Sequence, residues 1–143
     1  MNIQDICFKL LTTLRLLVDY SHSAHHNVKG ALFFADHKEL NKFYDELVED
    51  FDRAGEKYVS LYGAYNIQSL LKAMLAESLK LPTGEVKENK DYFTALLGLE
   101  KELCAHVDII IKTGGFNEGT KDIFIHLASR SEERQYKIKR RIM

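Results

Sequence analysis

The chain has 143 residues, of which 45% are hydrophobic and 29% are charged, so it has the size and composition of one globular domain, residues 1–143. Twenty basic and 21 acidic residues give a formal net charge of −1, which excludes a general attraction to DNA phosphates or to an anionic membrane surface. The first residues lack the pattern of a secretory signal and no segment is apolar enough to span a bilayer, so we expect a cytoplasmic protein. Cys7 and Cys104 lie among apolar neighbours, as reduced, buried cysteines do.

Two long helices are expected before residue 64. The chain contains one proline and eight glycines, and its apolar residues recur at three- and four-residue steps, which is typical of an all-α protein. The first helix runs from the start of the chain to His25 or Val28, before Gly30. For the second helix, Asp36 stands where an N-cap belongs, and Gly63 marks the end.

The second half of the chain predicts a connection and two further long helices. A short amphipathic segment, Ile67 to Leu79, precedes the helix breaker at 81–84, so we expect a long connection that holds a small helix. A third long helix runs from about Glu88 to Lys112, and a fourth begins at about Glu118. Two antiparallel hairpins joined by one long crossover form an all-α, ferritin-like four-helix bundle.

Four residues of the first two helices are the candidate metal ligands: His25, His37, Asp52 and Glu56. Within one continuous helix, a rise of about 1.5 Å per residue separates His37 from Asp52 by roughly 22 Å, so a single ion cannot bridge them. If two such helices pack antiparallel about a two-fold axis, His37 of one chain approaches Asp52 and Glu56 of the other, and two equivalent sites form. The candidate site therefore predicts a dimer.

These ligand types suit iron. Ferrous iron accepts imidazole nitrogen and carboxylate oxygen, and a mixed site with open coordination positions leaves room for an oxidant. Ferric iron is harder and more highly charged, so two carboxylates favour the oxidised product. The ligand set therefore predicts oxidation at the metal, without a protein nucleophile.

The ordinary alternative for Asp52 and Glu56 is a pair of acids one turn apart on a solvated helix face. Asp52, however, falls beside Val48, Gly55 and Val59, on a partly apolar flank that we interpret as a candidate subunit interface, whereas Glu56 lies nearer the charged face. Gly55 costs roughly 1 kcal/mol relative to alanine inside a helix. It is either a tolerated defect or a place where a partner helix or an ion approaches the backbone.

The segment from His22 to Gly30, followed by Phe33 and His37, resembles the signature of the Dps family of mini-ferritins. His25 and His37 are twelve positions apart, His37 and Asp52 fifteen, and Asp52 and Glu56 four, which matches the ferroxidase ligand spacing of that family. The resemblance implies hollow shells of twelve subunits. Such shells bind ferrous iron at two-fold dimer interfaces, oxidise it preferentially with hydrogen peroxide and store the ferric product.

Two positions depart from the family pattern. His26 stands where the family usually has tryptophan, and Asn41 where many members have an aspartate that assists a weaker second iron. We expect His26 to be solvated or ion-paired and the second iron position to be weakened. His22, one turn before His25, is either a hydrogen-bonding partner of the ligands or a peripheral metal ligand, and zinc is a candidate competitor for the same ligands.

The remaining polar motifs favour simpler explanations. No histidine has a glutamate three residues before it, so a di-iron centre inside a single bundle is disfavoured. His106 and His126 belong to the later helices, and packing or solvation is sufficient to explain both residues. Glu118 and Asp122 stand where related shells have acidic pores, but acids at a helix start also complement the macrodipole. Cations likewise complement the C-terminal end of a helix. We therefore assign five basic residues near the C-terminus to the helix end rather than to binding of nucleic acid: Arg134, Lys137, Lys139, Arg140 and Arg141.

Two other functions remain open. Some Dps proteins coat DNA through a basic N-terminal tail, and a DNA-binding stress-protection protein is one alternative, although the first helix is expected to begin almost at once and to leave no such tail. The other is a catalytically silent helical scaffold, in which His26 and Asn41 record lost chemistry.

Overall fold

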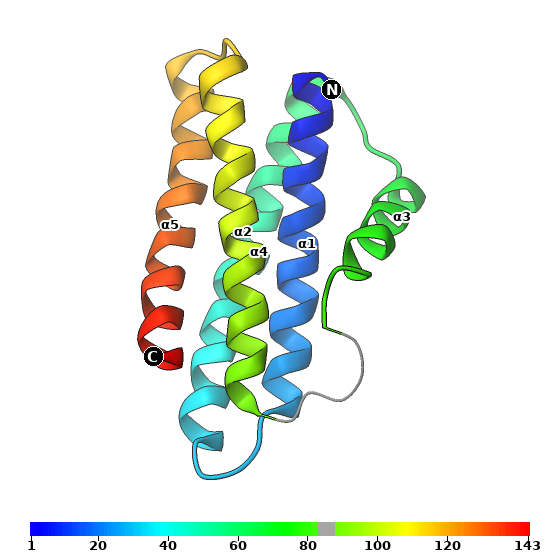
Figure 1. Cartoon of the computed structure of the whole chain (residues 1–143). Helices are drawn as coiled ribbons and strands as arrows, with labels where there is room; N and C mark the ends of the chain where they lie inside the picture. Colours follow the sequence, from blue (N-terminus) through cyan, green and yellow to red (C-terminus); the bar gives the residue numbers. More distant parts are fainter. Residues whose placement is uncertain (83–87) are drawn as a thin grey trace.

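A computed structural model describes residues 1–82 and 88–143, and these residues form five α-helices and no strand. The helices are α1 (Ile3–Asn27), α2 (Phe33–Tyr62), α3 (Ile67–Ser78), α4 (Asn89–Thr113) and α5 (Glu118–Ile142). In Figure 1, α1 and α5 run downward while α2 and α4 run upward, so α1/α2 and α4/α5 are antiparallel hairpins. Because α2 and α4 run in the same direction, the connection between them must return along the length of the bundle, and this long crossover contains α3, as the sequence predicts.

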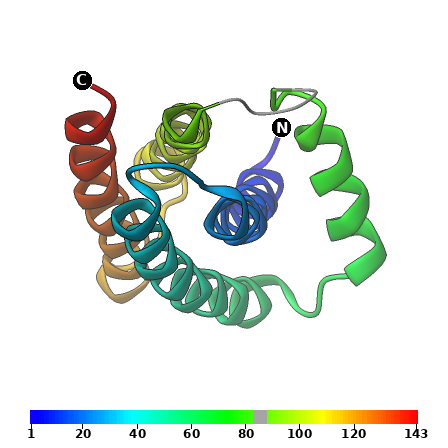
Figure 2. The same cartoon turned by 90° about the horizontal axis from the view of Figure 1, so that it is seen from below.

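The long helices pack in the cyclic order α1, α2, α5, α4, while α3 lies beside α1. The view along the bundle in Figure 2 shows α3 outside the bundle. None of the helices in residues 1–82 and 88–143 has the length and apolar character needed to cross a membrane. Part of the breaker predicted at 81–84 falls outside the described residues.

Local polar contacts fix several helix ends. At the start of α1, the Asn2 side chain accepts a hydrogen bond from the Asp5 backbone N–H at 2.8 Å, and the Asp5 carboxylate accepts one from the Asn2 N–H at 3.2 Å. The α2 helix ends at Gly63, whose φ of +89° is rarely adopted by residues with a side chain. The predicted C-terminal ends are confirmed, since α1 ends at Asn27 and α2 ends before Gly63.

The assignment of Asp36 as an N-cap is wrong. The α2 helix begins at Phe33, and Asp36 lies inside it, where its buried carboxylate accepts two hydrogen bonds of 2.8 Å from Arg141 and one of 3.0 Å from Asn89. Burial alone would raise the pKa of Asp36, but the hydrogen bonds from Arg141 and Asn89 outweigh it and lower that pKa. Asp36 therefore joins the ends of three helices.

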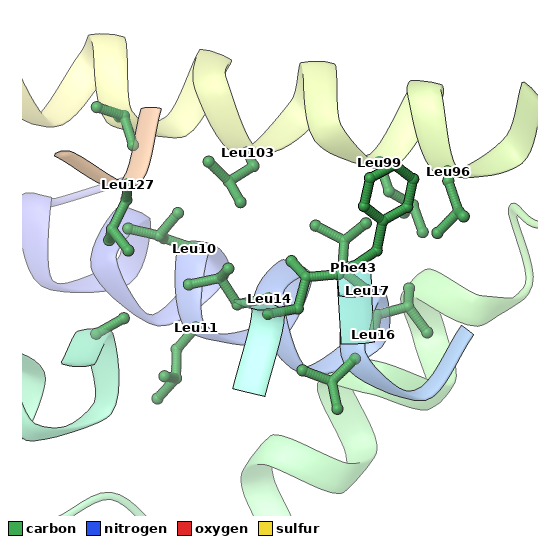
Figure 3. Packing of buried hydrophobic residues seen from close by; sticks show 14 of the residues in the cluster. Leu10, Leu11, Leu14, Leu16, Leu17, Phe43, Leu96, Leu99, Leu103 and Leu127 are labelled. Atoms are coloured by element: carbon green, nitrogen blue, oxygen red, sulfur yellow. The ribbon is translucent and has the colours of Figure 1, made fainter. Parts of the chain in front are cut away.

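The core is an aliphatic seam between the hairpins. Figure 3 shows leucines of α1 facing leucines of α4, with Phe43 of α2 completing the layer. The fully buried members of this seam include Leu10, Leu14, Leu17, Leu96 and Leu103. At about 1.5–3 kcal/mol for each fully buried leucine or phenylalanine, this seam is the main source of stability.

A buried ion-pair network crosses the bundle interior. Arg134 of α5 is 1% exposed, and its guanidinium donates to Glu100 of α4 at 2.6 Å and to Asp50 of α2 at 3.0 Å. Arg130 also donates to Asp50, at 2.6 Å. Although burial alone would lower the pKa of Arg134, the adjacent carboxylates outweigh it and raise that pKa.

The assignment of the basic C-terminal segment to the helix end is therefore wrong for Arg134 and incomplete for Arg141, which lies in the last turn of α5 but also has a carboxylate partner. Arg134 is an interior ion-pair partner, and Arg141 binds Asp36. Both are neutralised by carboxylates from helices far away in sequence, which a pattern within α5 cannot show.

Candidate metal centre

His25 and His37 lie side by side where α1 and α2 meet at one end of their hairpin. Their imidazole rings stack with centroids 3.7 Å apart and an angle of 22° between the planes. Nδ1 of His25 lies 2.9 Å from the backbone oxygen of His37, and Nδ1 of His37 lies 2.8 Å from the backbone oxygen of His25. The structure thus brings these two candidate ligands together through a reciprocal pair of hydrogen bonds.

The reciprocal bonds determine the tautomer of each ring. A carbonyl oxygen can only accept, so each Nδ1 must carry the hydrogen and donate it. In the neutral imidazole, the remaining nitrogen, Nε2, then holds the lone pair that a metal requires. This arrangement, in which the second ring nitrogen orients a metal-binding histidine, is common in metal sites.

Aromatic contacts hold the histidine pair in place. Phe33 stacks on His37 with centroids 4.9 Å apart, so the His37 ring lies between Phe33 and His25. His22 stacks on Tyr44 at 4.1 Å and lies 6.2 Å from the ring of His25. The supporting roles of Phe33 and Tyr44 are not evident from the sequence, because ring stacking between two helices depends on how the helices pack.

Asp52 and Glu56 lie farther along α2, and both are exposed. They border a shallow groove of about 390 Å³ together with Phe51, Val59 and Tyr65. The carboxylates of this groove are free to turn toward a ligand because the described residues provide them with no ion-pair partner.

The histidine and carboxylate pairs are separated within one chain. Because α2 is a single helix of 30 residues, the 15 positions from His37 to Asp52 correspond to about 22 Å. Within residues 1–82 and 88–143, no three histidine, cysteine, aspartate or glutamate side chains are grouped so that they could hold a metal ion. That the two pairs meet across a dimer interface remains a prediction.

Gly55 lies on the flank between the core and the carboxylates. It is buried, and a Cβ at this position would lie 3.7 Å from Cδ1 of Leu11, an ordinary contact. The position is thus directed partly toward α1 of the same chain. An alanine at this position would therefore fit within the chain itself. The variant Gly55→Ala can thus distinguish a tolerated defect from a close approach by a partner helix or an ion.

The other titratable residues from the sequence analysis lie elsewhere. His126 is exposed, while His106 is half-buried 3.7 Å from Glu102, and burial lowers its pKa. Glu118 and Asp122 are exposed at the start of α5. Cys7 is buried and Cys104 partly buried, and both are free thiols.

The arrangement of the long helices and their crossover defines a ferritin-like four-helix bundle. Three solved structures show the same fold over nearly the whole chain. A histidine-to-glycine mutant of Listeria innocua Dps matches with a TM-score of 0.82 at 17% identity, covering 99% of this chain and 96% of that one. Staphylococcus aureus Dps matches with a TM-score of 0.83 at 14% identity, covering 99% and 95%. Dps from Microbacterium arborescens, solved in a high iron form, matches with a TM-score of 0.80 at 19% identity, covering 95% and 89%.

A curated relative agrees with the structural match. The DNA protection during starvation protein of Helicobacter pylori is 34% identical over 85 residues, which are 57% of this chain and 58% of that protein. The match therefore spans little more than half of that relative's length. No family model matches the chain. The chain therefore has the ferritin-like four-helix-bundle fold of the Dps structures, and over 85 residues its sequence is similar to that of a Dps protein.

Proposed function

We propose that this protein oxidises ferrous iron at sites shared between two copies of the chain and stores the ferric product inside an oligomeric shell. The observation that supports this most strongly is the His25–His37 pair, whose reciprocal hydrogen bonds leave both Nε2 atoms available to a metal. The exposed Asp52 and Glu56 lie on α2, the helix that also carries His37. The Asp52 and Glu56 of the second copy supply the oxygen ligands.

Each pair of ligands has its own role. The imidazoles bind ferrous iron through Nε2, and the carboxylates neutralise the charge that increases when iron loses an electron. Hydrogen peroxide is the proposed oxidant: two ferrous ions give up two electrons, and peroxide with two protons becomes two waters. Asn41 replaces an anionic oxygen with an amide, so a second iron at the same site binds more weakly. Zinc competes for the histidines because it also accepts imidazole.

The proposed assembly is a shell of twelve subunits in the cytoplasm. The H. pylori relative is named for DNA protection during starvation, and the M. arborescens structure is described as a high iron form. These names support a protective, iron-handling role here. A bundle of this fold that remained a solid dimer would have no interior for ferric iron, so the storage part of the proposal requires a closed shell.

The test is anaerobic loading with ferrous iron followed by a pulse of hydrogen peroxide, with ferric absorbance recorded over time. We compare the native protein with Asp52→Ala/Glu56→Ala. The control is Glu132→Ala/Glu133→Ala, which removes the same charge from two exposed acids of α5. We expect fast oxidation by the native and control proteins and only the slow background rate for Asp52→Ala/Glu56→Ala.

Two outcomes would contradict the proposal. Equal, slow oxidation by all three proteins would favour the silent scaffold. Fast oxidation that survives loss of Asp52 and Glu56 would move the chemistry away from the shared site. Strong, salt-dependent binding to duplex DNA by the same carboxylate variant would favour the DNA-binding alternative, and native mass spectrometry reports whether the shell closes.

A further inference from the structure

His22 and His26 form a second histidine pair, distinct from His25 and His37. They are four positions apart on α1, so they occupy the same face of the helix on successive turns, and their ring centroids are 4.5 Å apart. His22 is half-buried and His26 is exposed, which leaves the pair open to solvent. His25 does not belong to this pair, because its ring is bonded to the backbone of α2.

The ring nitrogens of the pair are not used by the described part of the chain. Within residues 1–82 and 88–143, neither His22 nor His26 makes a side-chain hydrogen bond or ion pair, whereas His25 and His37 do. Tyr44 of α2 stacks on His22 at 4.1 Å with 19° between the ring planes. This contact restricts the His22 ring while leaving its nitrogens at the ring edge.

The spacing of the two rings fits one metal ion. With metal–nitrogen bonds of about 2.0 Å, each imidazole centroid lies about 3.2 Å from the ion, and two ligands at 90° then have centroids about 4.5 Å apart. The separation of 4.5 Å in the structure therefore places the two rings close enough to bind one ion from adjacent coordination positions.

We propose that His22 and His26 form a bidentate site for Cu²⁺, with water completing the coordination. Imidazole is a good ligand for Cu²⁺, and among divalent first-row metals Cu²⁺ binds a given nitrogen site most tightly. Both ligands come from one helix, so the site needs no second copy of the chain. It therefore goes beyond the proposed iron site, which requires two copies and different residues.

Copper binding is measured by equilibrium dialysis of the full-length protein with Cu²⁺ alone, and by quenching of tyrosine fluorescence. The chain has seven tyrosines and no tryptophan, so bound Cu²⁺ next to Tyr44 reduces the emission directly. We expect His26→Gln to weaken Cu²⁺ binding by roughly tenfold or more, since altering even the hydrogen-bond partner of a metal ligand costs about 10- to 100-fold. The matched control is His126→Gln, which changes an exposed histidine of α5 and should bind Cu²⁺ as the native protein does.

Further variants separate this site from the iron site and from a change in folding. Tyr44→Phe should reduce quenching while leaving the dialysis affinity unchanged. Because Cu²⁺ also accepts the imidazoles of the proposed iron site, the comparison is repeated in the Asp52→Ala/Glu56→Ala background, where adding His26→Gln should still remove Cu²⁺ binding, so the two proposals can fail independently. Cu²⁺ binding that is the same with and without His26→Gln in the Asp52→Ala/Glu56→Ala background would overturn the copper site. Circular dichroism establishes that each variant retains its helices.

Discussion

The shared iron site can be tested by combining two defective chains. One variant, His25→Ala/His37→Ala, lacks the nitrogen ligands, and the other, Asp52→Ala/Glu56→Ala, lacks the oxygen ligands. Because α2 is continuous, the two ligand pairs of a single chain are about 22 Å apart and cannot meet on one ion. A mixed dimer, however, brings the histidines of one variant to the carboxylates of the other.

The expected recovery follows from symmetry. When equal amounts of the two variants are unfolded together and refolded, about half of the dimers contain one chain of each kind. Each mixed dimer has one site with all four ligands and one site with none, so the mixture should regain about one quarter of the native sites. Each variant refolded alone should have no complete site.

The measurement is the initial rate of ferric absorbance after a peroxide pulse, normalised to total protein. Variants that are folded separately and mixed without exchange of subunits provide the baseline. Recovery near one quarter of the native rate would support ligands shared between copies. A refolded mixture as slow as its components, although mass spectrometry detects mixed dimers, would refute the two-chain site.

The remaining predictions concern stability, measured by urea unfolding. Gly55→Ala should raise the free energy of unfolding by about 0.5–1 kcal/mol, because the methyl makes only an ordinary contact and alanine favours the helix; a loss of stability would indicate that the methyl meets a partner chain. Arg134→Met should cost about 3–5 kcal/mol by leaving a buried carboxylate uncompensated, and adding Glu100→Met should recover part of that loss, whereas additive losses would contradict the coupling. Burial alone would raise the pKa of Asp36, but the hydrogen bonds that its carboxylate accepts outweigh burial and lower that pKa. The ionised carboxylate therefore contributes its full stabilisation of the fold above the unfolded pKa of about 4, and this contribution is lost as the pH falls through the folded pKa. Asp36→Asn should therefore be less stable than the native protein at pH 7, by a margin that shrinks below about pH 4; a margin independent of pH would exclude this role of the ionised carboxylate.

The sequence determined the helices and their order. Apolar spacing placed all five helices within a few residues of their observed ends, because a helix needs one apolar stripe and clear stop signals such as Gly63. The long crossover followed from two hairpins that must pack as one bundle. The ligand spacing also allowed the candidate residues to be named before any coordinates, although their shared site remains a prediction.

Only the tertiary structure decided how polar side chains are paired across the bundle. Asp36 looked like a helix cap and Arg134 like a helix-end cation, yet each is buried against charged groups from other helices. The orientation of His25 and His37 likewise depends on backbone oxygens twelve positions away. Local spacing specifies which face of a helix a residue occupies, but a polar contact between helices depends on their rotation and offset, which the packing of the whole core sets.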